Sequence, residues 1–401
     1  MILLGIASLI YAATLAGLIL GLRRLSRNRL LTFEKWPSIS VIVPARNEAE
    51  VLERTLQSLL AQDYPGEWEI IVVDDRSTDQ TPELLQRLST EFPRIRPVRV
   101  TDRHPVSPKK NALAMGIRLA RGELIATTDA DCSYDKSWLA MMVSHLTPEV
   151  GVVAGLTIFD LPTDHAPRWQ KIQWLDFFVQ NFLAAGAAGA GLPSSCNGSN
   201  LVYRRRVYDE ISGFGTAANV ISGDDVLFTQ RVSHLTKWKV VFSIEKATIV
   251  RSLPVVTIRE LCQQRLRWAS KGLTYRPSMM SFLFGIYAYY LMLLLSPFAL
   301  YLYPTHAPLL CGILVWKFGW DYITVRQGAK IFGQQRLLPY FVPFSILQTA
   351  FYPAIGFAAL LLPYRWKGDW YRTARLPRLL RHRIIKMRRS IRSRRTVTSD
   401  S

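Results

Sequence analysis

Two short acidic segments each follow an apolar run that resembles a β-strand. Asp74 and Asp75 follow the run at 70–73, and Asp129 and Asp131 follow the run that starts at Leu124. Continuous apolar runs with β-branched residues are typical of central strands in a parallel sheet covered on both faces. Ligands of open α/β sheets bind at the carboxyl ends of such strands. The clustered carboxylates therefore indicate a bound cation or a sugar nucleotide, although one acidic turn alone is commonly a solvated loop.

Four further motifs accompany these acids along the chain. A first strand and its loop run from Ser40 to Glu48, and a helix opens at Lys109-Lys110-Asn111. Farther on come Gly223-Asp224-Asp225 and Gln264-Arg265-Leu266-Arg267-Trp268. The ordered set resembles glycosyltransferase family 2, in the membrane-bound branch that includes cellulose and hyaluronan synthases and ceramide glucosyltransferase-like enzymes. The resemblance covers roughly residues 37–275 and implies an α/β fold of the GT-A type, a Rossmann-like nucleotide-sugar-binding domain.

Apolar segments flank this domain. Residues 1–22 are apolar and long enough to span a membrane at ~1.5 Å per residue. Arginines follow them, which by the positive-inside rule places the N-terminus outside and the next domain in the cytoplasm. A cleaved signal peptide, the alternative, would carry its positive charges in front. We expect a transmembrane helix at 1–22, a basic linker at 23–36, the GT-A domain at 37–275, a membrane block at 276–364 and a basic tail at 365–401.

The membrane block contains three apolar stretches, Met279–Tyr303, Ala307–Ile323 and Leu337–Pro363. If the third stretch crossed straight through, the most basic part of the chain would lie outside, against the positive-inside tendency. Prolines also interrupt this stretch, and proline breaks or kinks a helix. We therefore predict that it is a broken or re-entrant element, which leaves the tail on the cytoplasmic side.

The formal net charge of +20 lies largely in the tail from Arg365 to Arg395. Apolar residues recur there at helical spacing between arginines, which favours an amphipathic helix on an anionic membrane surface. A solvated, disordered tail is the alternative interpretation. No zinc-finger, helix-turn-helix or RNA-binding motif precedes the tail, so nucleic acid is not an expected partner.

The resemblance implies that most of these motifs bind a nucleotide sugar. The expected contacts are Pro44, Arg46, Glu48, Asp75, Lys109, Lys110, Asp129, Gln264, Arg265, Arg267 and Trp268. Several of these residues also have ordinary structural interpretations. Pro44 fits turn chemistry, Glu48 fits the first turn of a helix, and the two lysines fit a solvated loop. The arginines and Trp268 also fit snorkelling and interfacial positions beside a membrane.

A diphosphate beside Asp129 and Asp131 would repel both carboxylates unless a divalent cation lay between them. Hard oxygen ligands and a hydrated, phosphate-bound site favour Mg²⁺ or Mn²⁺. The resemblance implies that Asp131 binds this cation and that Asp129 contacts the nucleotide and the cation. The cation would stabilise the departing nucleoside diphosphate.

Glycosyl transfer also needs a base for the acceptor hydroxyl. Carboxylates act as bases in glycoside chemistry when their environment tunes the pKa. The resemblance implies that Asp225 is this base and that Asp224 orients it or caps the helix that Val226 starts. A simple N-capping turn at 223–225 is the alternative interpretation.

The remaining chemistry-bearing residues form no recognisable site. The four cysteines show no Cys-x-x-Cys spacing, which argues against thiolate metal binding, and we expect all four to be reduced, buried and apolar in character. No catalytic role is expected for the six scattered histidines. An apolar stripe that includes Leu175, Val179 and Phe182 fits ordinary core, an acceptor-side wall or a lipid-facing helix.

The expected function is inverting transfer of a sugar, from a UDP-sugar, to a membrane-associated acceptor at the cytoplasmic face. A lipid acceptor fits the small number of predicted downstream spans. A processive polysaccharide synthase is the alternative within the same family. A nucleotidyltransferase would not explain the Gln-x-x-Arg-Trp motif beside spans, and a non-catalytic membrane scaffold would not explain the complete acid set. The sequence predicts no oligomeric state.

Overall fold

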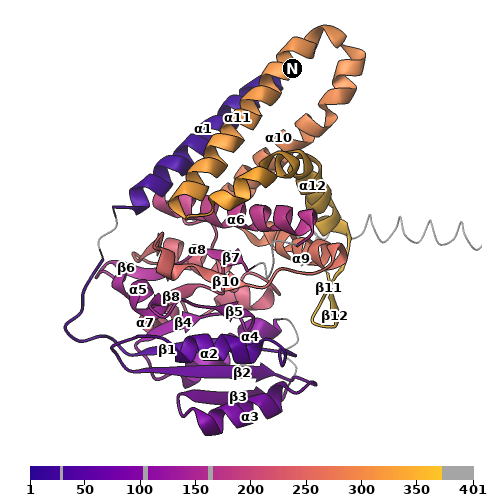
Figure 1. Cartoon of the computed structure of the whole chain (residues 1–401). Helices are drawn as coiled ribbons and strands as arrows, with labels where there is room; N and C mark the ends of the chain where they lie inside the picture. The colour runs from indigo at the N-terminus through magenta and orange to yellow at the C-terminus, as the bar shows by residue number, and fades with distance from the viewer. Residues whose placement is uncertain (28–29, 103–106, 161–165, 373–401) are drawn as a thin grey trace, which may run out of the picture.

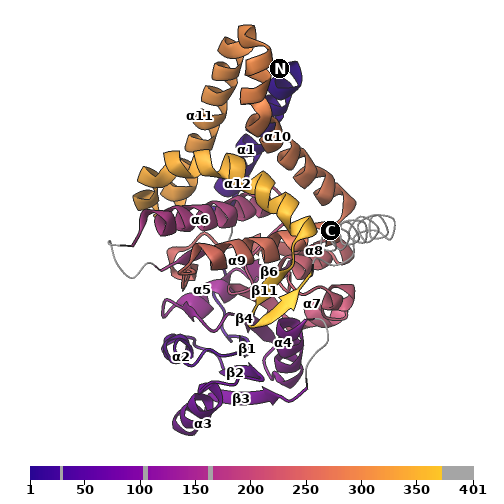
Figure 2. The same cartoon turned by 90° about the vertical axis from the view of Figure 1, so that its right-hand side faces the viewer.

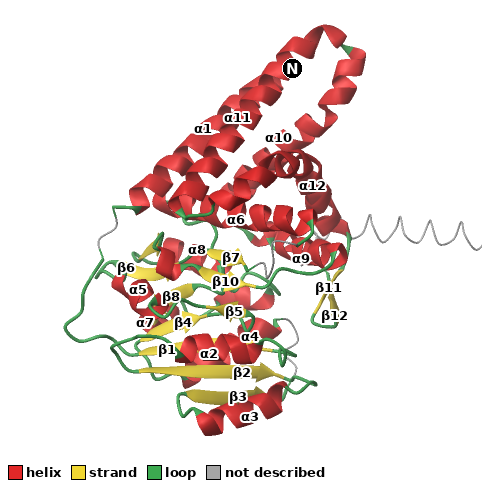
Figure 3. Ribbon diagram, in the orientation of Figure 1, coloured by secondary structure: helices red, strands yellow, loops and turns green. Residues whose placement is uncertain are grey.

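The structure is a computed structural model that describes residues 1–27, 30–102, 107–160 and 166–372. An α/β domain carries a group of long apolar helices on one side (Figure 1). Within these residues, strands lie in the α/β domain, apart from a short hairpin that follows the last helix (Figure 3). The expected membrane surface helix within 373–401 lies outside the described residues.

Seven strands form a mixed sheet in the order β3-β2-β1-β4-β8-β6-β9. Their bounds are β1 Ile39–Ala45, β2 Trp68–Asp75, β3 Ile95–Val100, β4 Leu124–Thr127, β6 Val150–Ala154, β8 Leu201–Arg204 and β9 Lys239–Phe242. The strands from β3 to β4 are parallel, β8 is antiparallel to β4 and β6, and β9 is parallel to β6. The strand order reverses between β1 and β4, and open α/β sheets bind ligands at such a switch point.

Helices cover both faces of this sheet, as the continuous apolar strands predict. In β1, Ile42 packs into one hydrophobic cluster, whereas Val41 and Val43 pack into the other. This alternation follows from the two-residue period of a strand. The covering helices are α2 Leu52–Leu60, α3 Thr81–Glu91, α4 Pro108–Leu119, α5 Trp138–Ser144, α7 Arg205–Glu210 and α8 Val226–Leu235.

A smaller three-stranded sheet lies beside the switch point, in the order β5-β10-β7. Its strands are β5 Cys132–Ser133, β7 Thr157–Phe159 and β10 Val250–Ser252. Strand β5 begins directly after Asp131, so the small sheet holds the second acid of the Asp-Ala-Asp segment. Short 3₁₀ helices complete the connections, at Gly215–Asn219, Lys246–Thr248, Gly272–Thr274, Pro304–His306 and Gln335–Tyr340.

Two helices, α6 (Arg168–Gly189) and α9 (Ile258–Ser270), lie between the sheets and the apolar helices (Figure 2). Helix α9 begins with a capping box in which Thr257 and Glu260 satisfy each other's backbone N–H groups. In α6, Leu175 and Phe182 are fully buried in the main hydrophobic cluster. The ordinary-core interpretation of the apolar stripe is therefore confirmed for these residues.

Helix α1 (Ile2–Leu25) packs on α6 through glycines at a very close approach. A Cβ built on Gly21 would lie 2.0 Å from the carbonyl oxygen of Gly186, and one built on Gly189 would lie 2.1 Å from that of Gly21. Only glycine fits where two backbones come this near. The contact attaches the N-terminal helix directly to the α/β side of the molecule.

The apolar helices are α1, α10 (Pro277–Leu302), α11 (Ala307–Ile331) and α12 (Phe341–Leu361). Among the described helices, three are long and apolar enough to cross a membrane, namely Ile2–Leu25, Pro277–Leu302 and Gln335–Leu361. The segment 307–323 does not meet this criterion of length and composition, so its expected crossing stays a prediction. It belongs to the longer α11, whose Lys317 and Asp321 form a buried ion pair at 2.8 Å inside the helix group.

Helix α12 lies across α6 and α9 rather than alongside α1 and α11 (Figure 2). The helix is continuous from Phe341 to Leu361, with Pro353 in its interior. The broken or re-entrant path expected for this segment stays a prediction. The side of the membrane reached by each end stays a prediction.

Two expectations need correction. Of the four cysteines, only Cys132 is buried, while Cys196 and Cys262 are half-buried and Cys311 is exposed on α11. Cys311 lies on a helix surface that the described elements leave uncovered. The boundary drawn at 365 also cuts through a hairpin, β11 (Tyr364–Trp366) and β12 (Asp369–Tyr371). Lys367 and Gly368 form its two-residue turn with positive φ angles of 48° and 86°, as a type I′ turn requires.

Candidate active site

The acids at the strand ends converge beside the switch point. Asp129 follows β4 and Asp131 precedes β5, while β1 pairs with both β2 and β4. Ser252 Oγ donates to Asp131 Oδ2 at 3.0 Å. Burial and the neighbouring Asp129 raise the pKa of Asp131. A buried carboxylate beside a second carboxylate is unfavourable unless a cation compensates both charges.

The donor set fits the expected cation. Asp129 and Asp131 offer hard carboxylate oxygens. Among the described residues, no group of three or more His, Cys, Asp or Glu side chains could hold a metal ion, so the protein would supply only these two carboxylates. Mg²⁺ typically binds through one or two carboxylates and keeps waters and substrate phosphates as its other ligands. The two acids therefore suit Mg²⁺ or Mn²⁺ bound together with a diphosphate.

The second acid pair lies at the start of α8, after Gly223 with φ of 85°. Asp225 Oδ1 accepts from the backbone N–H of Val226 at 2.6 Å, and its Oδ2 accepts from that of Gly198 at 3.0 Å. Asp225, rather than Asp224, is therefore the residue that caps the helix. Lys271 Nζ lies 3.8 Å from Asp225 Oδ1, a partner that was not predicted from the sequence.

Lys109 joins the two acid pairs. Its Nζ lies 2.6 Å from Asp129 Oδ1 and 3.0 Å from Asp224 Oδ2. Burial alone would lower the pKa of Lys109, but Asp129 and Asp224 outweigh burial and raise it. Residues some ninety-five positions apart in the chain thus meet at one ammonium group.

Lys110, the adjacent residue, points elsewhere. Its Nζ donates to the backbone carbonyls of Ala217, Val220 and Ser222, and its side chain is buried. Burial lowers the pKa of Lys110 to about 8. These contacts hold the loop that precedes Gly223, and Lys110 thereby fixes the backbone that leads into Asp224 and Asp225.

The two arginines of the Gln-x-x-Arg-Trp motif on α9 have different surroundings. Arg265 forms a buried ion pair with Asp176 of α6, which also accepts from Tyr352 of α12 at 2.7 Å. Its guanidinium lies 4.4 Å from the ring centroid of Trp268, which itself contacts Phe177. Arg265 and Trp268 therefore tie α9 to its neighbours.

Arg267, on the same helix, faces the acids. Burial lowers its pKa, and the electrostatic influence of Asp224 and Asp129 opposes this shift. Its guanidinium also lies 5.2 Å from the ring centroid of Trp366 in the hairpin. Gln264 Oε1 accepts from Arg265 at 3.2 Å. Of the two arginines in the motif, the structure brings Arg267 to the acid site and commits Arg265 to α6.

The expected nucleoside contacts lie under the hairpin. Lys367 Nζ lies 2.6 Å from Glu48 Oε1, and Asp369 Oδ2 accepts from Arg46 Nη1 at 3.2 Å. Burial raises the pKa of Glu48 despite Lys367. Asp75 at the end of β2 pairs with Arg76 at 2.9 Å, and Pro44 lies within β1 beside them.

This hairpin was not predicted, although its sequence contains a usable signal. Tyr364 and Trp366 flank Arg365 before the Lys367-Gly368 pair, and Trp370 and Tyr371 follow Asp369 after it. Two short β-type runs around a two-residue turn are typical of a hairpin. The arginine-rich stretch that follows favoured the interpretation as a tail.

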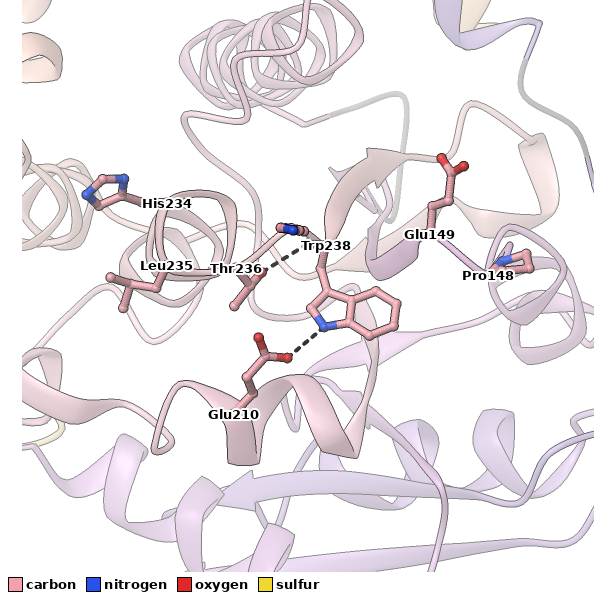
Figure 4. Close-up of a pocket in the computed structure, with 8 residues that line it drawn as sticks. Pro148, Glu149, Glu210, His234, Leu235, Thr236 and Trp238 are labelled. Carbon is pink, nitrogen blue, oxygen red and sulfur yellow. Dashed lines mark hydrogen bonds between the residues drawn. The ribbon is translucent and has the colours of Figure 1, made fainter.

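A surface cleft of about 700 Å³ opens at the far edge of the sheet (Figure 4). It is lined by Pro148, Glu149, Glu210, His234, Leu235, Thr236, Lys237 and Trp238. Trp238 Nε1 donates to Glu210 at 2.8 Å across its floor. None of the expected site residues lines this cleft, so it is separate from the acid site.

Comparison with known proteins gives one family match and several distant relatives. Residues 40–212 match the family described as Glycosyl transferase family 2. The chain is 29% identical over 238 residues to beta-monoglucosyldiacylglycerol synthase of Nostoc sp., an alignment of 59% of this chain and 49% of that protein. It is 26% identical over 251 residues to poly-beta-1,6-N-acetyl-D-glucosamine synthase of Staphylococcus epidermidis, and this alignment covers 61% of this chain and 58% of that protein.

Among solved structures, the chain is similar to the mannosyltransferase PcManGT from Pyrobaculum calidifontis, in complex with GDP-Man and Mn²⁺, at 19% identity and a TM-score of 0.49. That likeness covers 89% of this chain and 96% of the other. The chain spans about half the length of the monoglucosyldiacylglycerol synthases that it matches. The chain therefore has an α/β fold with a mixed sheet and acids at the strand ends, and its residues 40–212 are similar to Glycosyl transferase family 2.

Proposed function

We propose that the protein is a membrane-bound inverting glycosyltransferase that moves a sugar from a nucleotide sugar, a UDP-sugar, onto a membrane lipid. The observation that carries the proposal is the convergence of Asp129 and Asp224 on Lys109. This convergence brings together one pair of carboxylates that would bind a cation and diphosphate and a second pair that would remove the acceptor's proton. Helix α9, which carries Arg267, packs against α12 and lies next to the apolar helices (Figure 2).

In this mechanism Asp225 takes the proton of the acceptor hydroxyl. The N–H groups of Val226 and Gly198 and the ammonium of Lys271 hold its carboxylate in place. The acceptor oxygen forms a bond to the anomeric carbon as the bond to the diphosphate oxygen breaks, so the configuration inverts. A preoriented base of this kind typically contributes ~10²–10⁴-fold in rate.

The donor side uses the remaining residues. Asp131 and Asp129 would hold Mg²⁺ or Mn²⁺, which when bound neutralises charge on the departing diphosphate. Arg267 adds a fixed positive charge on the same side, and arginine matches a pyrophosphate through paired hydrogen bonds. Glu48, Arg46 and Asp75 would contact the nucleoside.

A lipid acceptor is supported by two observations. Three described helices are suited to a membrane, and the similar Nostoc protein is named for a glycolipid product. The similarity to a poly-N-acetylglucosamine synthase supports the second candidate, a processive polysaccharide synthase. The two candidates differ in product rather than in donor chemistry.

The test is a product analysis with the full chain in lipid nanodiscs. UDP-glucose, UDP-galactose, UDP-N-acetylglucosamine and GDP-mannose are each supplied with Mn²⁺ and diacylglycerol, and lipid and aqueous phases are analysed by mass spectrometry. We expect one sugar on the lipid, in the anomeric configuration opposite to that of the donor. A sugar polymer would establish the second candidate, and no transfer from any donor would overturn both.

A further inference from the structure

Lys109 occupies an unusual electrostatic position in this site. Its side chain is 19% exposed, and it contacts one acid from each pair, Asp129 at 2.6 Å and Asp224 at 3.0 Å. An ammonium has three N–H donors, so these two contacts leave one. Lys109 lies in the first turn of α4, where the helix backbone limits how far its Cα can move.

The two acids that Lys109 contacts differ in how firmly they are held. Asp224 follows the loop that Lys110 fixes through three backbone carbonyls, and its side chain is 9% exposed. The side chain of Asp129 is 34% exposed. If one contact of Lys109 breaks, we therefore expect it to be the contact with Asp129.

Asp129 is also an expected ligand of the divalent cation. An oxygen in contact with an ammonium at 2.6 Å cannot bind a cation without bringing two positive charges together, and like charges at this range repel strongly. Lys109 and a divalent cation therefore compete for Asp129.

We propose that Lys109 is a positioning residue that exchanges partners when the cation binds. Without the cation, its ammonium bridges Asp129 and Asp224 and supplies the missing positive charge. With the cation on Asp129 and Asp131, Lys109 keeps Asp224 and turns its freed donors to the donor diphosphate. The inference rests on the proposed function, since it needs the same cation and diphosphate.

The test measures Mn²⁺ binding to the full chain in nanodiscs, from the electron paramagnetic resonance signal of free Mn²⁺, without nucleotide. Lys109→Met removes the competing charge, so we expect its affinity for Mn²⁺ to rise about tenfold over wild type. Lys109→Arg keeps the charge and should bind as wild type does. Lys237→Met, which removes an exposed lysine of the distant cleft, is the matched control and should also match wild type.

A double-mutant cycle tests whether Lys109 exchanges carboxylate partners or only adds positive charge near the cation. Asp224→Asn leaves Lys109 on Asp129 alone, so Mn²⁺ binding should weaken in the wild-type background and change little beside Lys109→Met. Adding UDP should tighten Mn²⁺ binding more in wild type than in Lys109→Met. Unchanged or weaker Mn²⁺ binding by folded Lys109→Met, or equal effects of Asp224→Asn in both backgrounds, would overturn the inference. A wild-type chain that binds neither Mn²⁺ nor UDP would instead overturn the proposed function.

Discussion

The ammonium of Lys367 lies 2.6 Å from Oε1 of Glu48, which joins the hairpin after α12 to the loop after β1. Asp369 on the same hairpin pairs with Arg46 at 3.2 Å. The two expected nucleoside contacts are therefore oriented by a segment that lies more than three hundred residues later in the chain. This arrangement connects the donor site to the apolar helices, because the hairpin follows α12 directly.

The first prediction concerns this ion pair. Lys367→Met should weaken UDP binding several-fold, because Glu48, whose pKa burial already raises, loses the charge that orients its carboxylate. Arg365→Met is the control, since Arg365 is exposed on the same hairpin and should leave UDP binding unchanged. Isothermal titration with UDP checks both variants. Equal affinity in Lys367→Met and wild type would show that the hairpin does not orient the donor site.

The second prediction concerns the base. Asp225→Asn should lower turnover by ~10²-fold or more while UDP binding stays near wild type, since a base acts in the chemical step. The asparagine keeps an oxygen for the N–H of Val226, so the cap of α8 survives. Asp209→Asn changes an exposed aspartate and serves as the control. Substantial turnover by Asp225→Asn would refute the assignment.

The third prediction concerns the packing of α1 on α6. Gly21→Ala places a methyl group 2.0 Å from a backbone oxygen of Gly186, so the helices must separate and stability should fall by about 1–3 kcal/mol or more. Gly17 lies on the same helix, and a Cβ built on it would meet no atom within 4 Å. Gly17→Ala should therefore not destabilise the protein. Thermal melting of both variants in one detergent provides the comparison. Similar melting temperatures would argue against the close packing.

The fourth prediction compares two ion pairs of different burial. Asp176→Ala leaves Arg265, which is 4% exposed, without its carboxylate, and loss of a buried partner typically costs about 3–5 kcal/mol. Glu149→Ala breaks an exposed pair with Lys239 and should change the melting temperature little. An Asp176→Ala variant as stable as Glu149→Ala would contradict the structural role of Arg265.

The fifth prediction concerns acid stability. Both ring nitrogens of buried His145 lack a hydrogen-bond partner, and burial lowers its pKa to about 4. Its unfolded pKa is about 6.5, so protonation favours the unfolded state, and stability is lost as the pH falls from about 6.5 towards 4. At pH 5 the loss is about 2 kcal/mol.

His145→Leu should remove this part of the pH dependence. Chemical unfolding of wild type and variant at pH 7.5 and pH 5 measures it as the difference between the two pH responses. The remaining carboxylates titrate in both proteins and cancel in that difference. Identical pH responses would mean that His145 is not the responsible group.

The sequence determined the parts of this protein that depend on local pattern. The strands β1, β2 and β4 were predictable because continuous β-branched runs suit a sheet covered on both faces. The sequence also indicated helices that begin near Lys109 and at Val226, and α4 and α8 confirm them. The family match to residues 40–212 agrees with the ordered acids that indicated it.

Only the tertiary structure decided which side chains meet. Lys109 and Lys110 are equivalent in sequence, yet neighbouring helix positions point about 100° apart, so one faces the acids and the other faces backbone carbonyls. Arg265 pairs with Asp176, and Glu48 with Lys367, across long stretches of chain. Such partners are set by how helices and sheets pack, which no local pattern encodes, and the choice between Arg265 and Arg267 therefore had to come from the packed structure.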